Sequence, residues 1–338
     1  MDKKMTIEGF APTCLMGVTG AISNYKGYVE NINRLYFHSS YVYEKKKEDI
    51  YDSDENKMNV VFSRELPLQK EEFTERLSYY YGLDYYFKEV MEFDEMLDII
   101  EEHLKNDEPV MMEIDFFFME KHKYYNKYHD QHMMIVEGIE RDKKILMICE
   151  AIYGHFEMPF SEYQVYFNDV VQNRKRNVLL LLVKKSNKNR NNKVRKEWFI
   201  KDLEKSYNNL SEKNKKGVGM PALKEFEKDL LELIKSGKCK NGITIMGMWV
   251  FMCDNMNNVN FIREFKRDYP QFRSEALEEL RKACITINRK WFYITMALLD
   301  LEKNKYEDLE KAFISIEKSE KIKAKSIKTL MFEINSIR

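Results

Sequence analysis

Residues 132–150, HMMIVEGIERDKKILMICE, contain two apolar runs separated by a short charged segment. His132 opens the first run, Glu140–Lys143 separates the two, and Glu150 ends the second. Two short apolar runs joined by polar turn residues are typical of a β-hairpin with antiparallel strands. Because the second strand returns beside the first, we expect the Glu150 carboxylate to lie next to the His132 imidazole.

The rest of the first half alternates short strand-like and helical segments. Four stretches are β-branched or aromatic and bounded by charged or turn-forming residues: 59–64, 84–90, 109–115 and 178–184. Two stretches between them have helical periodicity, residues 70–81 and 93–105. This pattern predicts an α+β fold with an antiparallel sheet.

The second half is helical after a polar stretch. Residues 184–195 are rich in Asn and Lys and predict a solvated linker. An RNA-binding basic patch is the alternative, but aromatic residues do not interleave there. Amphipathic helices are expected over residues 198–209, 221–236, 243–257, 274–304 and 306–319. We therefore expect an α+β domain over residues 1–185, a linker over 186–196 and an all-helical domain over 197–338.

Composition narrows the classes of protein. The 338 residues include 56 Lys and Arg and 56 Asp and Glu, so the net charge of zero argues against a nucleic-acid partner. There is no apolar run of about 18 residues, which a membrane helix needs, and no secretory signal is seen at the start. The five cysteines have no disulfide-framework spacing, which suits the reducing cytoplasm.

Cys14 is the candidate nucleophile. Pro12 and Thr13 precede a run of helix-compatible residues, so Cys14 would lie in the first turn of a helix with Thr13 as a cap. The positive end of the helix dipole lowers the pKa of a thiol placed there and favours the thiolate. The alternative for Cys14 alone is a small buried apolar side chain.

His132 and Glu150 supply the other two parts of a catalytic triad. A nucleophile needs a base and the base needs an orienting group, which are the roles we assign to His132 and Glu150. His129 is the competing base, but it ends a polar loop, whereas His132 opens a strand. Cys149 would point to the opposite face of the strand from Glu150 and is not expected to be the nucleophile.

Asp115 and Thr13 are the candidate substrate-binding residues. Asp115 ends a strand before three phenylalanines, a setting suited to binding an ammonium group, although a turn-capping aspartate is an equal alternative. The aromatic loop 116–130 has the composition of a lid. A metal site made by Asp115, His129, Asp130 and His132 would leave Cys14 unexplained, and we expect no metal and no cofactor.

The order of these motifs resembles the N-terminal domain family of butirosin biosynthesis protein H. The resemblance covers residues 5–185 and lies in Cys14 at a helix start, the 109–115 strand, the stretch from His132 and a strand closing on Glu150, where the family usually has aspartate. It implies a papain-like cysteine protease fold in which Cys14 takes an acyl group from a carrier-protein thioester and passes it to an amine. The phosphopantetheine would belong to the substrate.

The resemblance also implies partners and a place in metabolism. An acyl or peptidyl carrier protein and a small amine acceptor, a diamine among the candidates, are expected, as in thiotemplated natural-product or nonribosomal-peptide biosynthesis. Independently of the resemblance, the aromatic-rich, net-neutral composition is compatible with a homodimer. The helical domain would form a substrate pocket, dock the carrier or dimerise. Residues 1–13 contain neither Gln nor Asn, so the second oxyanion-hole donor besides the Cys14 N–H would be Thr13 or another backbone amide.

Two other functions fit the same residues. A cysteine protease or amidohydrolase would use the same site with water as the acceptor. A non-catalytic binding protein on this scaffold would bury Cys14 and leave its thiol unreactive.

Overall fold

The computed structural model divides the chain into two compact units. It describes residues 19–22, 25, 35–47, 49–53, 57–64, 68–127, 129, 131–150, 153–185, 193–210, 217–239, 242–243, 245, 249–301 and 306–336. The first unit, called the sheet unit, comprises Met1–Leu35 and Gln69–Asn192, and the second, called the helical unit, comprises Tyr36–Leu68 and Lys193–Arg338. The segment Tyr36–Leu68 belongs to the helical unit, whereas the sequence placed it in the first domain, residues 1–185. Residues 186–192 of the expected linker lie outside the described residues.

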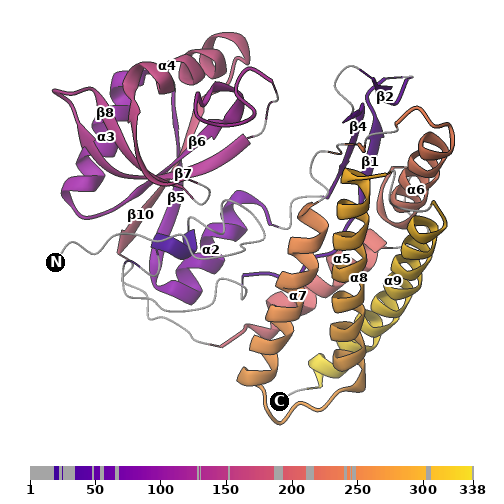
Figure 1. The fold of residues 1–338 in the computed structure, drawn as a ribbon. Helices are drawn as coiled ribbons and strands as arrows, with labels where there is room; N and C mark the ends of the chain where they lie inside the picture. Colours follow the sequence, from indigo (N-terminus) through magenta and orange to yellow (C-terminus); the bar gives the residue numbers. More distant parts are fainter. Residues whose placement is uncertain are drawn as a thin grey trace. The chain divides into compact units, whose positions relative to one another are not determined.

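The sheet unit is built on six antiparallel strands (Figure 1). In spatial order they are β5 (Leu83–Val90), β10 (Val178–Lys185), β6 (Val110–Asp115), β7 (Gln131–Glu140), β8 (Ile145–Glu150) and β9 (Gly154–Pro159). Five of these strands match or closely follow the expected segments, and β9 was not anticipated. The α+β class with an antiparallel sheet is therefore confirmed.

Helices α3 (Phe93–Lys105) and α4 (Phe160–Asn168) bury one face of this sheet. The shared core is formed by alternate strand residues such as Met112, Met134 and Ile148, together with apolar residues of both helices. Period-two alternation in the strands and period-3.6 periodicity in α3 turn these side chains toward the same layer. Helix α2 (Lys70–Tyr81) contacts β5 and ends at Gly82, whose φ of 63° is the left-handed value that suits a helix C-terminus.

The helical unit contains five long helices (Figure 1). They are α5 (Lys196–Leu210), α6 (Gly219–Lys235), α7 (Trp249–Asp268), α8 (Glu275–Leu299) and α9 (Tyr306–Asn335). Two short antiparallel strand pairs among the described residues belong to the same unit. The strands β1 (Val42–Lys45) and β4 (Val60–Ser63) form one pair, and β2 (Tyr51–Asp52) and β3 (Lys57–Met58), which lie between them in the chain, form the other. The helical C-terminal region is as expected, although α7 and α9 extend well beyond the predicted ends.

An extended segment, Tyr36–Tyr41, is buried among these helices. The Phe37 N–H donates to Asp202 of α5 at 3.0 Å, and the His38 N–H donates to Asn258 Oδ1 of α7 at 2.9 Å. Asn258 Nδ2 also donates to the His38 carbonyl at 2.6 Å. Because buried backbone groups must be hydrogen-bonded, these helix side chains replace the partners that a sheet would supply. They explain why Tyr36–Leu68 belongs to the helical unit.

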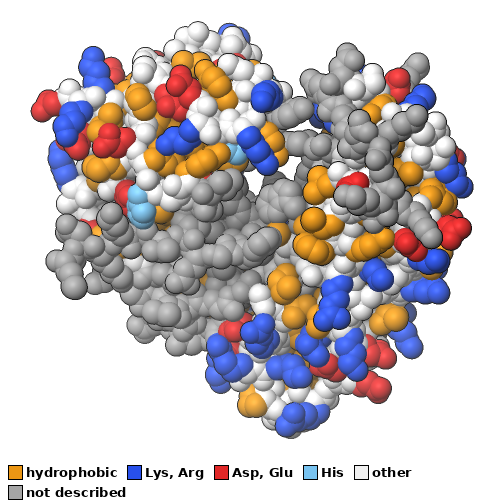
Figure 2. Space-filling view, in the orientation of Figure 1, with side chains coloured by type: hydrophobic (Ala, Val, Ile, Leu, Met, Phe, Trp, Pro, Cys, Tyr) orange, Lys and Arg blue, Asp and Glu red, His pale blue; other side chains and the backbone are white. Residues whose placement is uncertain are grey.

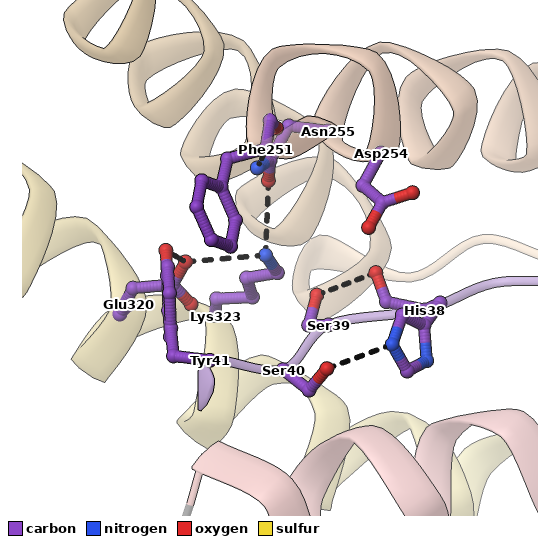
Figure 3. A pocket seen from close by; sticks show the side chains of 9 residues that line it. All are labelled: His38, Ser39, Ser40, Tyr41, Phe251, Asp254, Asn255, Glu320 and Lys323. Atoms are coloured by element: carbon purple, nitrogen blue, oxygen red, sulfur yellow. Dashed lines mark hydrogen bonds and ion pairs between the residues drawn. The ribbon is translucent and has the colours of Figure 1, made fainter. Parts of the chain in front are cut away.

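The same segment lines a small polar cavity of about 10 Å³, room for about one water molecule. Lys323 Nζ lies 2.9 Å from Asn255 Oδ1 and 3.4 Å from Glu320 Oε1, and Tyr41 donates to the same Glu320 oxygen at 2.6 Å (Figure 3). Asp254, another lining residue, pairs with Arg64 outside the close-up at 2.7 Å. Each buried charge thus has a partner of opposite sign, as buried ions require.

The described surface is mixed in character. Figure 2 shows basic and acidic side chains on both units, with hydrophobic side chains scattered among them. In the described part of the chain, no helix is both long enough and apolar enough to cross a membrane.

Candidate active site

Two of the expected site residues, Thr13 and Cys14, lie outside the described residues, as do Tyr128 and Asp130 of the expected lid. The described part of the candidate site is therefore built from residues of the sheet unit at the start of β7 and the ends of β6 and β8.

The hairpin of β7 and β8 brings His132 and Glu150 together. The strands pair in antiparallel register, with Ile135 opposite Cys149 and Val136 opposite Ile148. His132, at the start of β7, and Glu150, at the end of β8, consequently meet at the same end of the sheet. His132 Nε2 lies 2.9 Å from Glu150 Oε1. The carboxylate side chain is fully buried and the imidazole is 15 % exposed.

Both oxygens of Glu150 are engaged, which fixes the orientation of the carboxylate. Oε1 contacts His132, and Oε2 accepts a hydrogen bond from the Tyr153 backbone N–H at 3.0 Å. An ionised carboxylate is an acceptor only, so the contact assigns the proton of His132 to Nε2 in the neutral ring. Nδ1 is then the nitrogen at which this imidazole can gain and lose a proton.

An aromatic stack restrains the His132 ring. Phe116 lies between two histidines, with ring centroids 4.4 Å from His132 and 3.9 Å from His122. His122 Nδ1 accepts a hydrogen bond from the Tyr124 N–H at 3.1 Å, and burial lowers the pKa of His122, helped by Lys123. A neutral His122 can stack closely without repelling a protonated His132. Sequence reasoning missed Phe116 and His122 because their contacts depend on the loop after β6.

Asp115, expected to bind a substrate ammonium, has protein partners in the structure. Its Oδ2 lies 2.8 Å from Arg174 Nη2 and 2.9 Å from His129 Nδ1. Its Oδ1 accepts a hydrogen bond from the Phe117 N–H at 3.1 Å, which caps the short helix η2 (Phe116–Phe118). This is the turn-capping geometry of the alternative interpretation. Arg174, which the sequence did not suggest, follows the short π-helix Asp169–Asn173.

The two histidine–carboxylate pairs differ in their surroundings. The His129 side chain is 59 % exposed, and its partner Asp115 also has the guanidinium of Arg174 as a counter-ion. The His132 side chain is much less exposed, and its partner Glu150 is held by a backbone amide. A base must be oriented before it can act, so His132 is the better candidate. A guanidinium at Asp115 also disfavours the four-residue metal site considered above, since it repels a second cation.

Comparisons with known proteins add no family assignment. No protein-family model matches the chain, and no curated protein matches it. The candidate site therefore rests on the geometry of His132, Glu150 and Phe116.

Proposed function

We propose that the protein is a cysteine-dependent acyltransferase that forms an amide bond. Cys14 would be the nucleophile, His132 the general base and Glu150 the group that orients it. The observation that carries the proposal is the 2.9 Å contact between His132 Nε2 and Glu150 Oε1. It is the base and orienter pair that a cysteine nucleophile requires.

The proposed reaction has two balanced steps. The Cys14 thiolate attacks the carbonyl of a carrier-protein thioester, the bond to the pantetheine sulfur breaks, and the leaving thiolate takes a proton from the His132 imidazolium. An amine then attacks the Cys14 acyl thioester and loses a proton to His132 Nδ1 as the Cys14 thiolate departs. Glu150 stabilises the positive charge on His132 whenever the imidazole is protonated.

A papain-like architecture for the sheet unit is part of this proposal. It is supported by the antiparallel sheet, by the histidine and the acid on neighbouring strands, and by the use of Nε2 for the acid, which leaves Nδ1 for the thiol. The resemblance of residues 5–185 to the butirosin biosynthesis protein H family points the same way. It also suggests a carrier protein as donor and an amine, a diamine among the candidates, as acceptor.

The substrate-binding roles remain predictions. Thr13 or a neighbouring amide would complete the oxyanion hole. A substrate ammonium would have to share Asp115 with Arg174 and His129, so we expect Asp115 to act mainly by holding His129 in place.

Intact-protein mass spectrometry tests the proposal. The full-length protein is mixed with acyl-pantetheine thioesters, beside a Cys14→Ala variant and a Cys239→Ser control, whose thiol is buried in the helical unit. We expect a mass increase equal to the acyl group in the wild type and the control but not in Cys14→Ala, and its discharge to an amide by a diamine. Discharge by water alone would indicate a hydrolase, and no adduct on Cys14 would indicate a binding protein.

A further inference from the structure

Three potential metal ligands converge on the sheet unit away from His132. Glu137 of β7, Cys149 of β8 and His155 of β9 each offer one ligand atom, and these three atoms lie within 4.8 Å of one another. The residues come from three neighbouring strands and include three different donor types, a carboxylate oxygen, a sulfur and an imidazole nitrogen.

Strand pairing and a β-bulge bring the three side chains to one face. Cys149 is directly opposite Ile135 on β7 and His155 on β9, so the side chains of Ile135, Cys149 and His155 point to the same face of the sheet. The register shifts after Val136, which leaves Glu137 as the extra residue of β7. From the two flanking strands Glu137 and His155 then meet across β8, with Oε1 and Nδ1 2.5 Å apart.

We propose that Glu137, Cys149 and His155 bind a Zn²⁺ ion. Zinc accepts sulfur, nitrogen and oxygen ligands with bonds of about 2.0–2.3 Å, so tetrahedral geometry places ligand atoms roughly 3–4 Å apart. The ligand atoms, all within 4.8 Å of one another and 2.5 Å apart in the pair of Glu137 and His155, are close enough for side-chain rotations to reach this spacing. A water molecule would take the fourth position. The mixed donor set disfavours Mg²⁺ and Ca²⁺, which prefer oxygen ligands alone.

Solvent can reach this site from one side. The His155 side chain is 34 % exposed and the Glu137 side chain 20 % exposed, whereas Cys149 is buried beneath the surface of the sheet. Binding would release the Cys149 thiol proton, so the affinity should increase with pH.

The zinc ion would restrain the hairpin of β7 and β8, which carries His132 and Glu150. Cys149 immediately precedes Glu150, the orienting acid of the candidate active site, and the ion would join β7, β8 and β9 on the opposite face of the sheet from the contact between Glu150 and His132. The inference does not depend on acyl transfer, because it concerns only the three ligands.

Cobalt titration of the full-length, metal-stripped protein tests this inference. Co²⁺ replaces Zn²⁺ in such sites and gives a near-ultraviolet charge-transfer band only when sulfur is a ligand. We expect one equivalent of Co²⁺ to produce this band, Zn²⁺ to displace it, and Cys149→Ser to abolish it. Cys239→Ser, in the helical unit, is the matched control and should behave as the wild type.

A second variant keeps the test decisive if Cys149→Ser does not fold. His155→Asn retains the thiol and should keep a sulfur band, with metal affinity lowered by at least about 10- to 100-fold, the usual cost of losing even an outer partner of a metal site. The proposal is overturned if the wild type shows no sulfur band at one equivalent, or if Cys149→Ser or His155→Asn binds cobalt as the wild type does.

Discussion

The two units use buried polar side chains in different ways. In the helical unit, Asp202, Asn257 and Asn258 are buried and hydrogen-bond the backbone of the extended segment Tyr36–Tyr41. In the sheet unit, one oxygen of the buried Glu150 carboxylate accepts a hydrogen bond from a backbone N–H, and the other contacts the imidazole of His132 at the start of β7. The first arrangement satisfies backbone groups that would otherwise be unpaired, whereas the second orients a group that can exchange a proton.

This difference separates structural from functional polar groups. Removing a side chain of the first kind should change the free energy of unfolding and little else. Removing one of the second kind should change reactivity more than stability. The following variants test that distinction, beginning with the largest expected effect.

His132→Ala should have the largest effect on the rate of acyl transfer. General acid–base groups typically contribute about 10²- to 10⁴-fold, and we expect a loss of this size in the rate of amide formation. Steady-state kinetics with an acyl-pantetheine donor measures it. His103→Gln is the control, since His103 lies on α3 and has Tyr86 and Glu108 as partners. A loss of less than fivefold in His132→Ala would refute the role of His132.

Asn258→Ala should have the largest effect on stability. The change leaves the buried N–H of His38 without its partner and removes one of two donors to the His38 carbonyl, which also accepts a hydrogen bond from Ser39 Oγ at 2.8 Å. At about 1–3 kcal/mol for an unsatisfied buried group, we expect the free energy of unfolding to fall by about 1–3 kcal/mol. Urea denaturation measures it. Asn260→Ala, on the same helix and bonded only to the exposed Arg263, should cost less than about 0.5 kcal/mol. Equal losses in the two variants would contradict the structural role of Asn258.

Much of this comparison could be predicted from the sequence, and the limits have physical causes. Helices α2 and α3 have the bounds read from their periodicity, and the hairpin that joins His132 to Glu150 follows from alternation and a polar turn. Local patterns decide such elements. The burial of Tyr36–Tyr41 was not predictable, because its partners lie 165 and 220 residues away at Asp202 and Asn258.

The rest of the site depends on irregular backbone. A register shift in β7 places Glu137 beside His155. A short π-helix precedes Arg174, whose guanidinium contacts Asp115. Neither feature has a sequence period. Strand β9 was missed because most of its residues are exposed, which leaves only a weak alternating pattern.

Glu150→Gln should have an intermediate effect that appears in the pH profile. The change removes a negative charge 2.9 Å from His132 while nearly preserving shape. A nearby opposite charge favours the protonated form of an imidazole, so its removal should move the alkaline limb of the rate profile to lower pH. Kinetics between pH 5 and 10 measures the shift. An unchanged profile would mean that Glu150 does not act through His132.

Glu227→Gln should have the smallest effect, confined to high pH. Burial and the neighbouring carboxylate of Glu317 raise the pKa of Glu227 to about 8. The folded state therefore binds a proton more tightly than the unfolded state, so this group lowers stability as pH rises from about 4.5 to 8. We expect Glu227→Gln to raise the urea midpoint at pH 8 but not at pH 4. The free energy of unfolding at pH 8 should rise by under about 1 kcal/mol because the site is half-buried. Glu232→Gln, on the exposed face of α6, should change neither midpoint, and an equal response would argue against the pairing.

The most direct test of the central claim is the pH dependence of Cys14 alkylation in the wild type and in His132→Ala. Burial raises the pKa of Cys239, that of Cys253 to about 12 and that of Cys284 to about 11, and Cys149 is also buried, so brief iodoacetamide treatment should modify mainly Cys14. Peptide mapping assigns the modification to each cysteine. We predict that Cys14 of the wild type reacts well below pH 8.5, the pKa of an ordinary thiol, and that His132→Ala moves this reactivity to higher pH, toward that value. The same profile in both proteins would contradict the account.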